Sequence, residues 1–99
     1  MGIQAELQGG VLNLYVKGVF DINSYDEFNA AYKPYLEQAQ RYVIDLREAT
    51  HIDSAALGLM LLLRQKTGGD DADITLQNAS DEVRKILDIA QFNQLFNVK

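Results

Sequence analysis

Cysteine is absent from this chain of 99 residues, and proline and histidine each occur once. Without cysteine the chain has neither a disulfide framework nor a thiolate metal site. Basic residues are also few: nine Lys and Arg against 14 Asp and Glu give a net charge of −5 at pH 7. Nucleic acids and anionic membrane surfaces require clustered Lys and Arg, and here they are scattered. The composition therefore argues against both, and favours another protein or a small ligand as partner.

Long hydrophobic runs are missing as well. The longest, from Ala55 to Leu63, is well under the ~20 residues that cross a bilayer, so we expect no membrane insertion. The start of the chain lacks the basic and continuously apolar segments of a secretory signal, and we therefore expect a cytoplasmic protein. The length and the 47% hydrophobic content predict a single globular domain over residues 1–99.

Two short alternations of apolar and polar residues open the chain. Ile3 to Leu7 and Leu12 to Val16 each have the period of a half-buried strand. Gly9-Gly10 between them suits a tight hairpin, because glycine accepts positive φ. Gly18 then closes the second strand.

Three helices are expected after this hairpin. Ser24 and Glu27 fit a capping box at the start of the first helix, and Pro34 should kink or split that helix. The second helix runs from about Ser54 to Thr67 and is apolar nearly all round. The third begins at Ser80.

Two further strands lie between these helices. Tyr42 to Leu46 is compact, β-branched and aromatic, as expected for a central strand covered on both faces. Asp73 to Gln77 is the next. The order β-β-α-β-α-β-α predicts an α/β domain: a mixed sheet with an N-terminal hairpin and three main helices packed against it.

Polar residues gather where two of these strands end. In open α/β sheets, functional crevices form at the carboxyl ends of parallel strands. The connections Val19 to Asn23 and Arg47 to Asp53 leave that end, so Asp21 and Ser54 should share one edge if their strands are parallel. On position alone, capping is the favoured role of Ser54, and an acid such as Asp53 stabilises a helix start without any further function.

Catalytic and metal-binding interpretations are weaker. His51 and Ser54 lie close in sequence, but no G-x-S-x-G elbow surrounds Ser54. Neither zinc-ligand spacing nor a phosphate-binding Gly-rich loop is present. The acids from Asp70 to Asp73 lack the central Gly and distal Glu of a calcium loop and read as a solvated turn. We therefore expect no enzyme, no cofactor and no metal.

The segment YVIDLREATHIDSAALGLMLLLRQ resembles the STAS domains of bacterial anti-sigma factor antagonists. The signature of that family is a hydrophobic strand, a loop, and Asp-Ser-Ser-Gly-Leu-Gly at the start of an apolar helix. Gly18-Val19-Phe20-Asp21 is similar to its Gly-x-x-Asp element, and VRKILDIAQFNQLFNV to its final helix and tail. Two positions depart from the signature: Ala55 replaces the second Ser and Ala56 the first Gly, while the second Gly is retained as Gly58.

The resemblance implies a role for each matching residue. Ser54 corresponds to the serine that a partner kinase phosphorylates, and Asp21 to the acid beside it that supports phosphorylation and partner binding. The surface around the phosphoacceptor is then expected to comprise Asp21, Asp53, Phe20, Ser24, Ala55 and Gly58.

The resemblance also implies partners. They are an anti-sigma factor or related serine kinase, which the unphosphorylated chain would sequester, and a PP2C-like phosphoserine phosphatase that would reset Ser54. Two alternatives stay open: a non-enzymatic STAS subunit of a membrane transport assembly, and a hydrolase acting through Ser54 and His51. A weak homodimer through the edge of the opening hairpin is also open.

Overall fold

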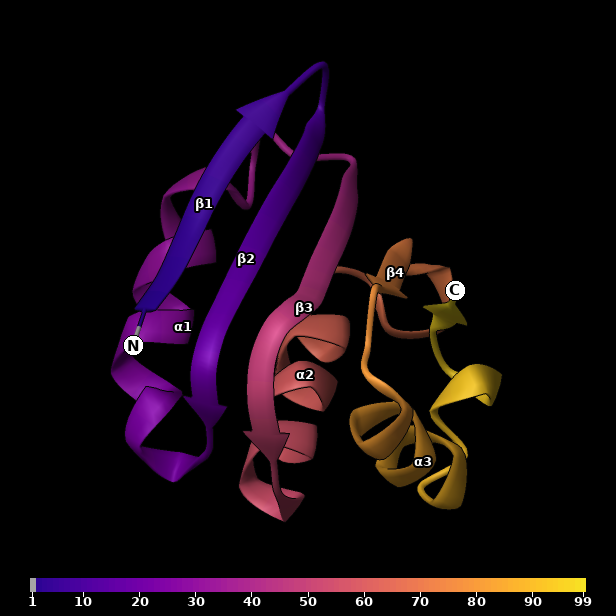
Figure 1. Cartoon of the computed structure of the whole chain (residues 1–99). Helices are drawn as coiled ribbons and strands as arrows, with labels where there is room; N and C mark the ends of the chain where they lie inside the picture. Colours follow the sequence, from indigo (N-terminus) through magenta and orange to yellow (C-terminus); the bar gives the residue numbers. More distant parts are fainter. Residues whose placement is uncertain (1) are drawn as a thin grey trace.

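A five-stranded mixed β-sheet with the strand order β1-β2-β3-β4-β5 organises the molecule (Figure 1). The computed structural model describes residues 2–99. The strands are β1 (Gly2–Gln8), β2 (Val11–Phe20), β3 (Arg41–Ile52), β4 (Ile74–Gln77) and β5 (Asn97–Val98). The α-helices are α1 (Tyr25–Tyr32), α2 (Ser54–Lys66) and α3 (Asp81–Ile89), and the short 3-10 turns are η1 (Ile22–Ser24), η2 (Lys33–Tyr35), η3 (Gly69–Asp71) and η4 (Phe92–Gln94). The predicted element order is confirmed, and β5 is an additional strand.

The predicted hairpin is present. β1 pairs antiparallel with β2, and Gly9 and Gly10 at its turn have φ angles of +59° and +80°, which glycine adopts without steric cost. The remaining pairs, β2 with β3, β3 with β4 and β4 with β5, are parallel. The carboxyl ends of β2 and β3 therefore point to the same edge of the sheet.

All three α-helices lie on one face of the sheet, and Figure 1 shows the other face in front with no helix over it. Sheet and helices share one apolar core, which includes Leu14, Ile44, Phe28, Met60 and Leu87. The expectation that the strand around Tyr42 to Leu46 is covered on both faces is therefore wrong. Its alternate residues are only half-buried, because they project from the uncovered face.

β3 is much longer than the sequence predicts. The segment from Arg47 to Ile52, expected as a loop, continues the strand and pairs with β2 up to Phe20. The alternation of buried residues breaks after Leu46, because register shifts in the β2–β3 pairing move Ala49 to the core side. A strand with such irregularities loses its strict period of two, which hides its continuation from a pattern search.

The start of α1 also differs from its prediction. Ser24 makes no side-chain cap to α1, and Glu27 does not return to it. The Glu27 carboxylate instead accepts a hydrogen bond from the Ile3 amide of β1 at 3.1 Å. Ser24 is the last residue of η1, where its hydroxyl accepts a hydrogen bond from the Asp21 amide. The true cap of this corner is therefore Asp21.

The ends of the helices agree with the sequence. α1 stops at Tyr32, and Pro34 lies in the following turn η2, where its missing amide breaks no α-helical hydrogen bond. α2 stops before Gly68 and Gly69, whose φ angles of +124° and +61° end the helix. Within residues 2–99 no helix is both long and apolar enough to cross a bilayer.

Candidate functional site

The candidate site lies where β2 and β3 end side by side. Phe20 and Ile52 are register partners at the ends of these parallel strands, so Asp21 and Asp53 follow at the same edge. The turn η1 that begins after Asp21 contacts α2. The prediction that Asp21 and Ser54 share one edge of the sheet is therefore confirmed.

Asp53, and not Ser54, caps α2. Its backbone is extended, and its carboxylate accepts a hydrogen bond from the Ala56 amide at 3.0 Å. Ser54 is the first residue of the helix proper and is exposed. The favoured structural interpretation of Ser54 as the N-cap is therefore wrong, because its neighbour already satisfies the orphan amide. The Ser54 hydroxyl is left available at the surface.

Asp21 is held in a reciprocal cap. Its carboxylate accepts a hydrogen bond from the Asn23 amide at 2.9 Å. In return, the Ser24 hydroxyl accepts one from the Asp21 amide at 3.2 Å and donates one to the Val19 carbonyl at 3.4 Å. The corner between β2 and α1 is therefore fixed by side chains on both sides of the turn.

Two residues expected at a partner surface lie in the interior. Phe20 is 0% exposed and belongs to the core, where its ring packs 5.3 Å from that of Phe28. Ser24 is 1% exposed. Neither side chain offers surface to a partner, and this corrects their expected place. Ala55 is half-buried and Gly58 is exposed on α2, so both stay on the outer side of the helix.

The sequence pattern missed three exposed apolar residues beside Asp21. Val19 is 42% exposed, Ile22 62% and Tyr25 44%. A signal was present in Ile22, which stands between the polar residues Asp21 and Asn23 in a segment read as a loop. In the structure Ile22 is the first residue of η1, whose buried residue is Ser24, and its own side chain is left exposed.

The start of α2 can accommodate an anion on Ser54. Backbone amides and the helix dipole make a helix N-terminus favourable for negative charge. The carboxylates of Asp53 and Asp21 lie at the same edge. A phosphate on Ser54 would thus be tolerated by its own helix while making this edge strongly negative. Within residues 2–99 no cluster of three or more His, Cys, Asp or Glu side chains is arranged to hold a metal ion.

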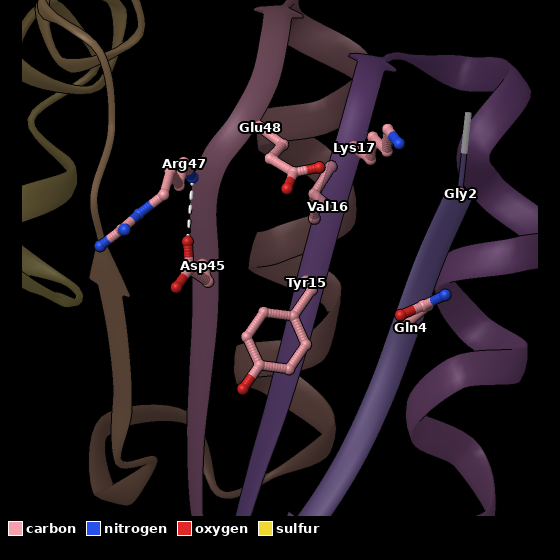
Figure 2. Close-up of a pocket in the computed structure, with 8 residues that line it drawn as sticks. All are labelled: Gly2, Gln4, Tyr15, Val16, Lys17, Asp45, Arg47 and Glu48. Carbon is pink, nitrogen blue, oxygen red and sulfur yellow. Dashed lines mark hydrogen bonds between the residues drawn. The ribbon is translucent and has the colours of Figure 1, made fainter.

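A groove of about 880 Å³ opens on the helix-free face, away from this edge. Figure 2 shows its lining side chains on three neighbouring strands, β1, β2 and β3. It forms where the β2–β3 register shifts, between the pairs Tyr15–Asp45 and Lys17–Glu48. The Asp45 carboxylate is already engaged there, accepting hydrogen bonds from the Arg47 amide at 2.9 Å and from two amide side chains of β4 and the loop after it. None of the residues expected at the phosphoacceptor lines this groove.

The chain belongs to the STAS domain family. A family model described as "Mlab, STAS domain" matches residues 3–97. A STAS-domain containing protein of Pseudomonas aeruginosa (strain UCBPP-PA14) is 48% identical over 90 residues, which cover 91% of this chain and 89% of that protein. The resemblance inferred from the sequence is thereby confirmed, and proteins of this family are generally binding modules rather than enzymes.

Solved structures agree with this fold. The anti-sigma factor antagonist SpoIIAA in its unphosphorylated form has a TM-score of 0.76 at 17% identity, over 99% of this chain and 87% of that chain. A phosphorylated form of SpoIIAA, a cell fate determinant of Bacillus, also matches with a TM-score of 0.76 at 15% identity, over 99% of this chain and 91% of that chain. A sulfate transporter family protein of Wolinella succinogenes has a TM-score of 0.74 at 14% identity, over 93% of this chain and 80% of that chain. At these identities the likeness shows the fold alone.

Proposed function

We propose that this chain is a phosphorylation-switched binding module with Ser54 as its phosphoacceptor. In its unphosphorylated form it sequesters an anti-sigma factor or a related switch kinase, and so releases the sigma factor or regulator held by that partner. One observation carries the proposal: Ser54 is exposed at the first position of α2, and Asp53 does the capping in its place. The hydroxyl is therefore free of a structural task.

The switch follows from electrostatics at this edge. A phosphoserine adds a charge of about −1.5 to −2 and three strong acceptor oxygens. α2 itself favours that charge at its N-terminus. A partner docked here would face the phosphate together with Asp21 and Asp53, and burying or opposing such charges costs it several kcal/mol. Binding is thus lost without refolding of the domain, and a PP2C-like phosphatase restores it.

The likeness to SpoIIAA supports this proposal, because that anti-sigma factor antagonist has been solved both with and without its phosphate. The test is intact-mass analysis of the protein purified from its native cells, followed by mapping of any phosphate. We expect a fraction of the chain to carry one phosphate on Ser54, and a Ser54→Ala variant to carry none. Absence of phosphate from the wild-type chain under all growth conditions would overturn the proposal.

The fold shared with a sulfate transporter family protein favours a second candidate, a non-enzymatic subunit of a membrane transport assembly. In that role the same edge would be a permanent docking surface. Stable co-purification with a membrane transporter, by wild type and by Ser54→Asp alike, would support it. The switch proposal expects the Ser54→Asp variant to lose its partner.

A further inference from the structure

An exposed apolar ridge stands beside the phosphoacceptor. Val19, Ile22 and Tyr25 are each more than two fifths exposed, and Ile22 is the most exposed of them at 62%. They lie on the end of β2, on η1 and at the start of α1, and η1 contacts α2. Grouped apolar residues at the surface mark sites of interaction, whereas scattered ones do not. Because η1 lies against the helix that begins with Ser54, one partner can cover both the ridge and Ser54.

Ile22 is held by hydrogen bonds of its neighbours and not by packing of its own side chain. The bond from the Asn23 amide to the Asp21 carboxylate closes one side of the turn at 2.9 Å. The Ser24 amide donates to the Asp21 carbonyl at 2.9 Å, and the buried Ser24 hydroxyl ties the turn back to β2. These bonds fix the backbone of the turn, so the Ile22 side chain leaves it in a defined direction and the turn need not be ordered on binding.

The cap on this turn depends on an acceptor oxygen and not on a charge. Asn and Asp are about equally effective at such cap positions, because either side chain offers an oxygen to the free amides, whereas Ala offers none. One oxygen of the Asp21 carboxylate, Oδ1, accepts the hydrogen bond of its own turn. An Asn side chain at this position would keep that acceptor, so the geometry of the turn does not require the charge.

We infer that Ile22 is an apolar anchor that inserts into a hydrophobic socket on the partner, and that Asp21 positions it as a hydrogen-bond acceptor whose negative charge is dispensable. This inference rests on the proposed function, since the partner is the kinase that acts on Ser54. Asp21 is a positioning residue in this account, and the specificity of docking lies in the ridge.

The test compares removal of the Asp21 charge with removal of its capping oxygen. Each variant is expressed in cells that lack the chromosomal gene for this protein. Asp21→Asn keeps the acceptor, Asp21→Ala removes it, and Asp26→Asn removes an exposed charge of α1 that is not in the cap. Ile22→Ala removes the anchor, and Ile89→Ala, at the 74% exposed isoleucine of α3, is its matched control. The measurements are the initial rate of phosphate incorporation at Ser54 and the hydrogen exchange of the Asn23 amide.

We expect Asp21→Asn, Asp26→Asn and Ile89→Ala to be phosphorylated within about twofold of wild type, and Asp21→Ala and Ile22→Ala to be slower by about tenfold or more. Exchange at Asn23 should rise in Asp21→Ala and stay low in Asp21→Asn. A loss in Asp21→Asn as large as in Asp21→Ala would overturn the positioning role, and a wild-type rate in Ile22→Ala would overturn the anchor.

Failure of the inference can be distinguished from misfolding of a variant and from failure of the proposed function. If Asp21→Ala does not fold, Asp21→Asn and Ile22→Ala still decide the two parts of the inference. If wild type itself carries no phosphate, the proposed function has failed and the inference falls with it. A phosphorylated wild type combined with an inactive Asp21→Asn contradicts the inference alone.

Discussion

The Asp53 carboxylate accepts a hydrogen bond from the Ala56 amide at 3.0 Å, so the acid before Ser54 closes the first turn of α2. Asp53 thus caps the helix, and Ser54 is left as the phosphoacceptor. If Ser54 were the cap, phosphorylation would change the very group that satisfies the first amides of α2. Here the structural and the regulated oxygen belong to different residues, and the switch leaves the fold intact.

The cap predicts a specific loss of stability. Replacing Asp53 by Ala should lower the free energy of unfolding by about 1 kcal/mol, because it leaves an α2 amide without its partner. Asp53→Asn should lose much less, since its side chain retains an acceptor. Urea denaturation measures both, and Asp81→Ala, in the first turn of α3 but not its cap, is the control. Equal losses in Asp53→Asn and Asp53→Ala would show that charge matters more than the hydrogen bond.

The bond between Glu27 and the edge of the sheet is also testable. Glu27 accepts from the Ile3 amide, which joins α1 to the outer strand β1. Glu27→Ala should destabilise the domain by about 1 kcal/mol and speed the hydrogen exchange of the Ile3 amide. Glu37→Ala, at an exposed acid outside the sheet, should do neither. Unchanged exchange at Ile3 would show that this contact does not persist in solution.

Burial of Tyr42 predicts the behaviour at alkaline pH. Burial raises the pKa of the Tyr42 phenol above its ordinary value of 10.0, because the charged form loses hydration. The unfolded chain then releases this proton at lower pH than the folded chain does. The contribution of the neutral Tyr42 phenol to the free energy of unfolding is complete below about pH 10. It is lost as the pH rises through and beyond that value.

Tyr42→Phe should remove this part of the alkaline loss. We expect the urea midpoint of the variant to fall less steeply than that of wild type above about pH 10. Tyr15→Phe, at an exposed tyrosine of β2, serves as the comparison. Parallel curves for Tyr42→Phe and wild type would contradict the prediction.

Local chemistry made much of the fold predictable. Gly9-Gly10 and Pro34 act through their own backbone restrictions, so the hairpin and the end of α1 could be inferred from single positions. Predicting that Asp21 and Ser54 share an edge required only that β2 and β3 be parallel. The sheet order beyond this, and the two-residue strand β5, depend on contacts between distant segments, which leave no periodic pattern in so short a stretch.

The wrong predictions for the start of α1, the length of β3 and the uncovered face also have physical causes. Ser24 and Glu27 have the spacing of a capping box, but Asp21 competes for the same corner and gives η1 before α1. The continuation of β3 to Ile52 is hidden by the register shifts after Asp45. The uncovered face was missed at Tyr42 to Leu46, because the apolar and aromatic residues there fit a strand buried on both faces. Asp45 among them lines the groove on the uncovered face.

The sharpest test of the account is calorimetric titration of the partner kinase with unphosphorylated wild type, Ser54→Ala, Ser54→Asp and the protein phosphorylated on Ser54. We predict equal affinity for wild type and Ser54→Ala, a loss of about tenfold or more for Ser54→Asp, and a larger loss for the phosphorylated form, as its greater negative charge requires. If all four forms bind with the same affinity, Ser54 does not switch this surface and the central claim is contradicted.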